Sequence, residues 1–226
     1  MSGFKNLKSI TEEMLFRSSS NIIEYCVIEE EGQELFNFCL NIQDSITHKI
    51  SALETEKKDL EEDPNIYSSY DGLEFQNEDA ICGLEEFEIP TWTKLLYFTV
   101  PLNQIILVNI YVEKSLKSLC STYAPENTST CYGGYSLNLK QEKGKSIIES
   151  YLLYLNKFCN FNINIPQSLE YLNSHIRNIR NNFVHGDWEK CKTQLEQIDI
   201  NDLFAGTSEL FEAIENEFLR QNKFIK

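Results

Sequence analysis

An arginine and a histidine stand five positions apart near the end of a segment with helical apolar spacing, as Arg180 and His185. A guanidinium holds a phosphate through two parallel hydrogen bonds, and an imidazole moves a proton near neutral pH. Cleavage of RNA without a metal ion requires these two functions, because the 2′-hydroxyl of the substrate is itself the nucleophile. The pair therefore predicts a metal-independent ribonuclease site that uses no cofactor and spares DNA.

The side chains around this pair form a polar helix face without acidic residues. Residues 174–185 include two arginines, three asparagines and two histidines, and no aspartate or glutamate. A solvent-exposed helix face normally pairs Glu with Lys at four-residue spacing, so this face favours an anionic partner such as phosphate. Arg177 is a second candidate for phosphate binding. Lys190 and Lys192 are further candidates for binding RNA or phosphate. They belong to the same mildly basic window, 140–192, in which eight basic residues outnumber five acidic ones.

The helix that must position these groups is predicted between Pro166 and Gly186. Proline suits the first helical position, and glycine suits the position after the last turn. The apolar residues between them repeat at spacings of three and four, and this core seam is Leu169, Leu172, Ile176, Ile179 and Phe183. Arg180 and His185 point away from the seam but lie roughly 140° apart on a straight helix. Two copies of the helix related by a two-fold axis would bring both groups to one site, and a bend at Gly186 is the alternative.

Each histidine also has a structural interpretation. A protonated His185 at a helix C-terminus is stabilised by the helix dipole, so a capping role stands beside the catalytic one. His175 lies closer to the core seam and is interpreted as structural, and His48 has no evident partner. Trp188 is expected to cover the end of the helix, with base stacking as the alternative.

Composition limits the class of protein. The chain has 226 residues, a length that suits one large domain or one domain with an appendage. Hydrophobic residues make up 42% of it, which is enough to form a core. Seven cysteines show no C-x2-C spacing and no secretory signal precedes them, so reduced thiols are expected rather than disulfides or a zinc site. The uncharged run 95–112 contains a proline and several amides, which favours a buried core helix over a membrane span. A cytoplasmic protein without membrane contact is the resulting prediction.

The formal net charge of −15 is concentrated in the first hundred residues, which hold 21 acidic and 7 basic side chains, a net of 7 − 21 = −14. Residues 1–90 are predicted to form an acidic and less regular region of unknown role. Within it we expect a helix at 34–60, a strand or a helix at 21–28, and a loop with short strands at 65–90.

The second half, residues 91–226, is predicted to form an antiparallel helical bundle, so the expected fold class is all-α. A loop rich in Thr, Ser, Asn and Gly is expected at 124–144. The predicted helices of the bundle are 103–122, 146–158, 166–185 and 207–222.

The spacing of Arg180 and His185, with Asn181 directly after the arginine, resembles the R-x4-6-H motif of the HEPN family. The order of a helix at 109–120, a loop, a second helix and then the motif segment is also similar to the core of many HEPN proteins. The resemblance covers residues 95–222 and implies an all-helical bundle that dimerises through the motif helix. Active members of the family cut RNA without metal and act as toxins or in defence against phage.

On this template Arg180 and His185 are the catalytic pair and Asn181 is the polar residue after the arginine. Glu113 resembles an acidic residue that some families carry on the earlier helix. RNA, a second copy of the chain and an antitoxin or sensor protein are the implied partners. HEPN toxins paired with a nucleotidyltransferase-like antitoxin usually carry a tyrosine two residues after the histidine, where this chain has Asp187. That departure argues against control by adenylylation.

Two alternatives come from other classes of protein. A non-catalytic interaction scaffold would keep the helical fold, and the acidic charge of the chain favours it. A nucleotide-binding module would use Arg177 and Arg180 as a phosphate clamp without turnover.

Overall fold

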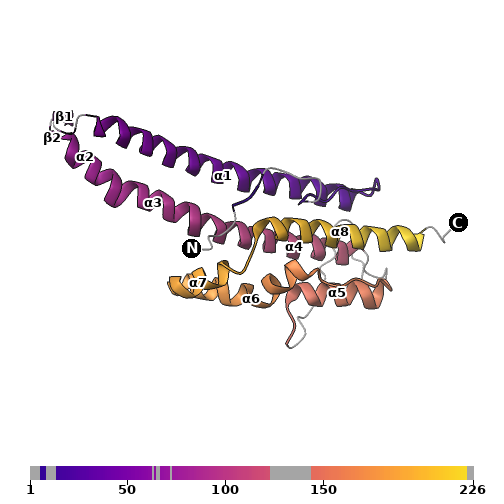
Figure 1. Cartoon of the computed structure of the whole chain (residues 1–226). Helices are drawn as coiled ribbons and strands as arrows, with labels where there is room; N and C mark the ends of the chain where they lie inside the picture. The colour runs from indigo at the N-terminus through magenta and orange to yellow at the C-terminus, as the bar shows by residue number, and fades with distance from the viewer. Residues whose placement is uncertain are drawn as a thin grey trace.

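The protein is built mainly from helices arranged as a bundle, with one small β-hairpin at its far end (Figure 1). The computed structural model describes residues 6–8, 14–62, 64, 67–71, 73–122 and 144–222. Helices account for most of these residues, so the predicted all-α class is confirmed. The elements in chain order are α1 (Ile23–Glu61), β1 (Tyr67–Tyr70), β2 (Leu73–Gln76), α2 (Asn77–Gly83), α3 (Ile89–Lys94), α4 (Val100–Thr122), α5 (Ile147–Phe158), α6 (Gln167–Val184), α7 (Trp188–Leu195) and α8 (Ile200–Asn222).

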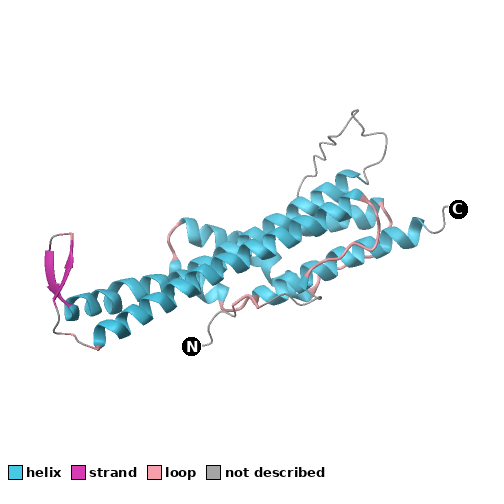
Figure 2. Ribbon diagram, turned by 90° about the horizontal axis from the view of Figure 1, so that it is seen from above, coloured by secondary structure: helices cyan, strands magenta, loops and turns pink. Residues whose placement is uncertain are grey.

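Two long helical rods lie side by side and antiparallel, and the β-hairpin joins them (Figure 1 and Figure 2). The first rod is α1, and the second, Asn77–Thr122, runs through α2, α3 and α4. Strands β1 and β2 pair antiparallel, with Tyr67 opposite Gln76. Both views show the hairpin end of the rods extending beyond helices α5 to α8.

The second rod stays continuous because two of its turns are π-helical. These wide turns, Leu84–Glu88 and Leu95–Thr99, each end just before a proline, Pro90 and Pro101 respectively. Proline cannot donate a backbone hydrogen bond and crowds the preceding turn, and a widened turn is one way in which a helix accommodates it. The expected loop at 65–90 is therefore wrong from Asn77 onward, although the short strands expected there are present.

The N-terminal region is also more regular than predicted, since α1 is 39 residues long and begins at Ile23. From Ile23 onward the undecided segment 21–28 is helical, because its apolar residues continue the spacing of the later ones. The buried positions of α1 repeat mostly at three or four residues, and they are Tyr25, Ile28, Gly32, Phe36, Cys39, Gln43 and Leu53. Gly32 is required in this stripe, because a Cβ at that position would lie 2.7 Å from the hydroxyl oxygen of Tyr111 on α4.

Helix α4 is the central element of the bundle and packs against α1, α5, α6 and α8. The uncharged run 95–112 lies mostly within it, and Leu102, Ile105 and Val108 are fully buried. By length and composition the helical stretch Asn77–Thr122 could cross a membrane, but 61% of its apolar window is buried inside the protein. That degree of burial is typical of a core helix, as the polar residues of the run suggest.

The segment before α1 and the last helix close the core together. Phe16 packs against Phe211 with ring centroids 6.0 Å apart, and Phe36 meets Phe204 edge-on at 5.0 Å. Glu215 on α8 is 2% exposed, and it accepts hydrogen bonds from the consecutive serines Ser18, Ser19 and Ser20. The residues on both sides of position 90 thus contribute to one hydrophobic core.

The helices of the second half largely match the expected ones. Helix α5 begins after Ser146, and α6 occupies the predicted range. Helix α8 begins at Ile200, seven residues before the expected start, and α7 is an element that the apolar spacing does not predict. Apart from Gly144, the loop expected at 124–144 lies outside the described residues.

Candidate functional site

Helix α6 presents its predicted core seam to the bundle and its polar face outward. Leu169, Leu172, Ile176 and Ile179 are all buried. The helix ends in a Schellman motif: the N–H of Gly186 donates to the carbonyl of Phe183 at 3.1 Å, and the N–H of Asp187 donates to that of Asn182 at 2.8 Å. Gly186 has a φ of +73°, which favours glycine. The predicted end of the helix is confirmed, and the motif fixes the backbone of His185.

Helix α7 folds back over the end of α6. Trp188 meets Phe183 edge-on at 5.4 Å and Phe98 at 5.5 Å, measured between ring centroids. The thiol of Cys191 donates to the carbonyl of Ile179 at 3.6 Å. These contacts agree with the expectation that Trp188 covers the end of the helix.

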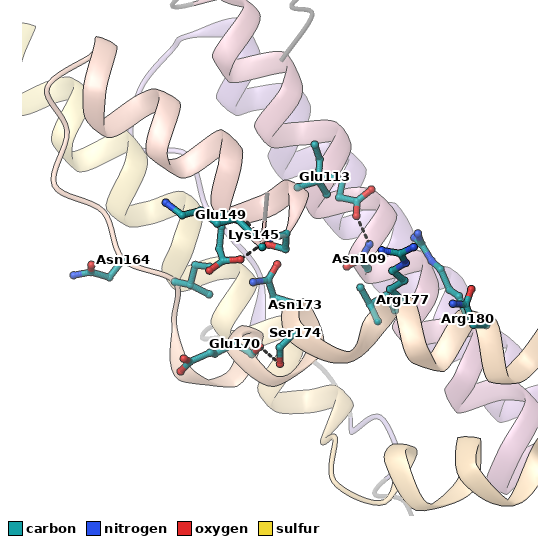
Figure 3. Close-up of a pocket in the computed structure, with 16 residues that line it drawn as sticks. Asn109, Glu113, Lys145, Glu149, Asn164, Glu170, Asn173, Ser174, Arg177 and Arg180 are labelled. Atoms are coloured by element: carbon teal, nitrogen blue, oxygen red, sulfur yellow. Dashed lines mark hydrogen bonds between the residues drawn. The ribbon is translucent and has the colours of Figure 1, made fainter. Parts of the chain in front are cut away.

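A cleft of about 1240 Å³ opens where α4, α5 and α6 meet (Figure 3). Four of the predicted site residues line it, namely Glu113 from α4 and Arg177, Arg180 and Asn181 from α6. Figure 3 shows the two arginine side chains extending from α6 toward α4, where Glu113 lies. Packing of three helices therefore assembles these residues on one polar surface.

The two cleft arginines differ from the other two arginines of the chain. Arg17 forms an ion pair with Glu29 at 2.8 Å, and Arg220 pairs with Glu217 at 2.7 Å. Within the described part of the chain, neither Arg177 nor Arg180 has a carboxylate within ion-pair distance. Arg180 is half-buried as a residue, and its guanidinium has no carboxylate beside it among the described residues. An anionic ligand would supply the missing negative charge.

Two buried amides on the cleft walls lack part of their hydrogen bonding. The amide nitrogen of Asn109 donates to Oε1 of Glu113 at 2.8 Å, while its Oδ1 has no partner among the described atoms. The Oδ1 of Asn173 on α6 is buried and unpartnered in the same way. A buried acceptor without a donor costs about 1–3 kcal/mol. Both atoms are sealed within the cleft walls, so each is an unsatisfied acceptor of the helix packing and neither faces the open cleft.

The α5 wall carries a carboxylate that already has partners. Glu149 accepts the backbone N–H of Ser146 at 2.6 Å, and its own N–H donates to the Ser146 hydroxyl oxygen, which forms a capping box. The backbone N–H of Ser146 holds the pKa of Glu149 below its ordinary value, against the effect of burial, with help from the Ser146 hydroxyl, the Asn173 amide and the charge of Lys145. Glu149 thus stabilises the start of α5 as a carboxylate.

The remaining predicted residues lie outside this cleft. His185 caps the C-terminus of α6 and is exposed, and it does not line the cleft of its own chain. Lys190 pairs with Asp187, and Lys192 is exposed on α7. A single chain therefore does not join Arg180 and His185 in one cavity, as the angle between them on the helix indicated.

The structure adds two cleft residues that the sequence analysis did not single out, Asn109 and Asn173. Both are buried amides on otherwise apolar helix faces, and that mismatch is the signal that would have found them. His175 stacks on Tyr171 with ring centroids 4.2 Å apart and lies 2.7 Å from the Ser174 hydroxyl, which agrees with a structural role.

Comparison of the chain with protein-family models, with curated proteins and with solved structures found no match. Among the described residues, no three His, Cys, Asp or Glu side chains are grouped closely enough to hold a metal ion.

Proposed function

We propose that this chain is a metal-independent endoribonuclease of HEPN type, whose active site forms between two copies of the protein. The observation that carries the proposal is the pair of arginines in the cleft, Arg177 and Arg180, which have no carboxylate partner among the described residues. Asn181 lines the same cleft, and His185 follows one helical turn later. A phosphodiester is the anion that suits two neighbouring guanidiniums.

The reaction is transesterification within the RNA. The 2′-oxygen attacks phosphorus while the bond from phosphorus to the 5′-oxygen breaks, leaving a 2′,3′-cyclic phosphate and a 5′-hydroxyl. Arg180 stabilises the negative charge on the non-bridging oxygens. His185 takes the proton of the 2′-hydroxyl, and a second imidazole or water returns a proton to the 5′-oxygen. Glu113 faces the arginines across the cleft, so we propose that it contacts the same RNA.

Two exposed apolar side chains beside His185 support the proposal that a second copy of the chain completes the site. Val184 and Trp188 flank His185 and are 77% and 47% exposed, which is high for large apolar side chains. Exposed apolar residues that gather at one place favour protein–protein contact. A two-fold dimer through this end of α6 would carry the imidazole of one copy toward the arginines of the other.

The cellular role rests on the HEPN resemblance of the Arg180–His185 segment. On that basis the protein is a cytoplasmic toxin or a phage-defence effector, and an antitoxin or sensor protein restrains it.

The test is an RNA cleavage assay in EDTA with purified native chain, Arg180→Ala and His185→Ala. Each variant should lose about 100-fold or more in rate, while Arg220→Ala and His48→Ala, which change residues outside the cleft, should cut at the native rate. The products should carry cyclic-phosphate ends, and DNA should stay whole. Equal cleavage by His185→Ala and native chain would refute the proposal.

Mixing the two inactive variants tests whether the site is shared. If the arginine of one copy works with the histidine of the other, a mixed dimer contains one intact site, and activity returns. A site built within one chain predicts no recovery.

A nucleotide-binding module without turnover is the second candidate, because His185 lies outside the cleft that holds both arginines. It predicts that mononucleotides raise the melting temperature while RNA remains uncut.

A further inference from the structure

The α4 wall of the cleft presents hydrogen-bond acceptors. Glu113 is half-buried, its Oε1 is fixed by the amide of Asn109 at 2.8 Å, and its Oε2 has no partner among the described residues. The Asn109 amide therefore orients the carboxylate, and Oε2 remains open to a donor from a ligand. The α4 wall thus offers a carboxylate oxygen without a donor, whereas Arg177 and Arg180 on the α6 wall have no carboxylate partner among the described residues.

A ligand that satisfies both sides carries an anion and, a short distance away, an edge of hydrogen-bond donors. Among the RNA bases only guanine offers an imino N–H and an amino group side by side on one edge, and a carboxylate accepts from both. Adenine and cytosine present one amino group next to an acceptor nitrogen, which a carboxylate would repel. The acceptor wall therefore matches guanine better than any other base.

The shape of the cleft favours a nucleotide within a chain. Ile147, Ile165 and Ile176 line it and offer apolar surface to the flat faces of a base. Its volume of about 1240 Å³ exceeds the range of roughly 300–1,000 Å³ of pockets for small ligands. The excess leaves room for the phosphates and sugars on either side of one base.

We infer that the cleft between α4, α5 and α6 recognises a guanine in single-stranded RNA, with Glu113 accepting from the Watson–Crick edge of the base and Arg177 and Arg180 binding the adjoining phosphates. This inference rests on the proposal that RNA occupies the cleft, but it does not require cleavage. It gives Glu113 a role in base specificity. From the sequence, Glu113 was a candidate only because it resembles an acidic residue of some HEPN families.

The experiment measures binding of short 2′-O-methyl oligouridylates, which cannot be cleaved, with a single central guanine, inosine or adenine. Inosine keeps the imino N–H of guanine but lacks its amino group. Native chain should bind the guanine oligonucleotide roughly tenfold more tightly than the adenine one, with inosine between them. Glu113→Gln should lose this preference, because an amide offers one acceptor and one donor.

The matched control is Glu196→Gln, which removes the same charge from an exposed position outside the cleft and should keep the guanine preference. Arg177→Gln should weaken binding of all three oligonucleotides by one common factor. Thermal melting of each variant establishes that it is folded.

Equal binding of the three oligonucleotides by native chain overturns base recognition and leaves RNA cleavage standing. A preference that survives Glu113→Gln overturns the role of this carboxylate. Guanosine monophosphate that binds as tightly as the guanine oligonucleotide overturns the assignment to RNA. Native chain that binds no oligonucleotide and cuts no RNA overturns both this inference and the proposed function.

Discussion

The two unpaired arginines predict how RNA binding responds to salt. Each guanidinium that neutralises a phosphate releases a counterion, and for single strands the slope of log K against log salt changes by about 0.7 for each contact. Replacing both Arg177 and Arg180 with glutamine keeps much of the side-chain stem and removes two charges. The salt slope should therefore become shallower by about 1.4. Fluorescence anisotropy with a labelled 2′-O-methyl RNA across a series of KCl concentrations measures it.

The control for this experiment is provided by the other two arginines. Replacing Arg17 and Arg220 with glutamine changes the net charge by the same two units, but both residues are paired with glutamates away from the cleft. That double variant should keep the native slope. If the two double variants flatten the slope equally, binding responds to overall charge, and the assignment of phosphate contacts to the cleft is refuted.

Two further predictions concern the elements that hold the site. Burial raises the pKa of Glu215, but the hydrogen bonds from the Ser18–Ser20 segment outweigh it and leave the pKa below its ordinary value. A depressed folded-state pKa contributes stability that is present above the unfolded-state pKa and is lost as pH falls through the folded-state pKa. Glu215→Gln loses the two hydrogen bonds that Oε2 accepts from Ser19 and places an amide against the donors, so it should cost about 3 kcal/mol at neutral pH. Measured by urea denaturation, the difference in free energy of unfolding between native chain and Glu215→Gln should shrink below about pH 4. A difference that stays the same at acidic pH would contradict the reasoning. Gly186→Ala should lower the free energy of unfolding by about 1 kcal/mol, because Gly186 has a positive φ. Gly83 has a helical φ and open space around it, so Gly83→Ala should raise the free energy of unfolding by about 0.5 kcal/mol or more. Equal effects at the two glycines, read from the same denaturation curves, would show that the Schellman geometry does not matter.

Local patterns predicted α6 well. Its apolar residues are spaced three and four positions apart, Pro166 precedes it and Gly186 follows it. The apolar spacing and the residues at both ends therefore indicate the same helix. The polar face of the helix could also be predicted, because exposure follows from the angle to the seam. Arg177 and Asn181 are exposed as this geometry requires.

Other parts could not be predicted, for physical reasons. Pro90 normally breaks a helix, and only the π turn before it lets the rod continue. Helix α7 has eight residues, too few for a clear period. The cleft depends on how α4, α5 and α6 pack, which apolar spacing within each helix does not determine. The HEPN likeness and the shared dimer site stay predictions.

The aromatic contacts between the two ends of the chain have a consequence for its synthesis. Phe16, Tyr25 and Phe36 leave the ribosome well before their partners Phe211, Phe218 and Phe204, which all belong to α8. The apolar stripe of α1 therefore stays partly uncovered until α8 has been synthesised, which exposes the nascent chain to aggregation and chaperone binding. A chain that lost α8 through a premature stop codon would keep that exposure, so the cell should clear such fragments quickly.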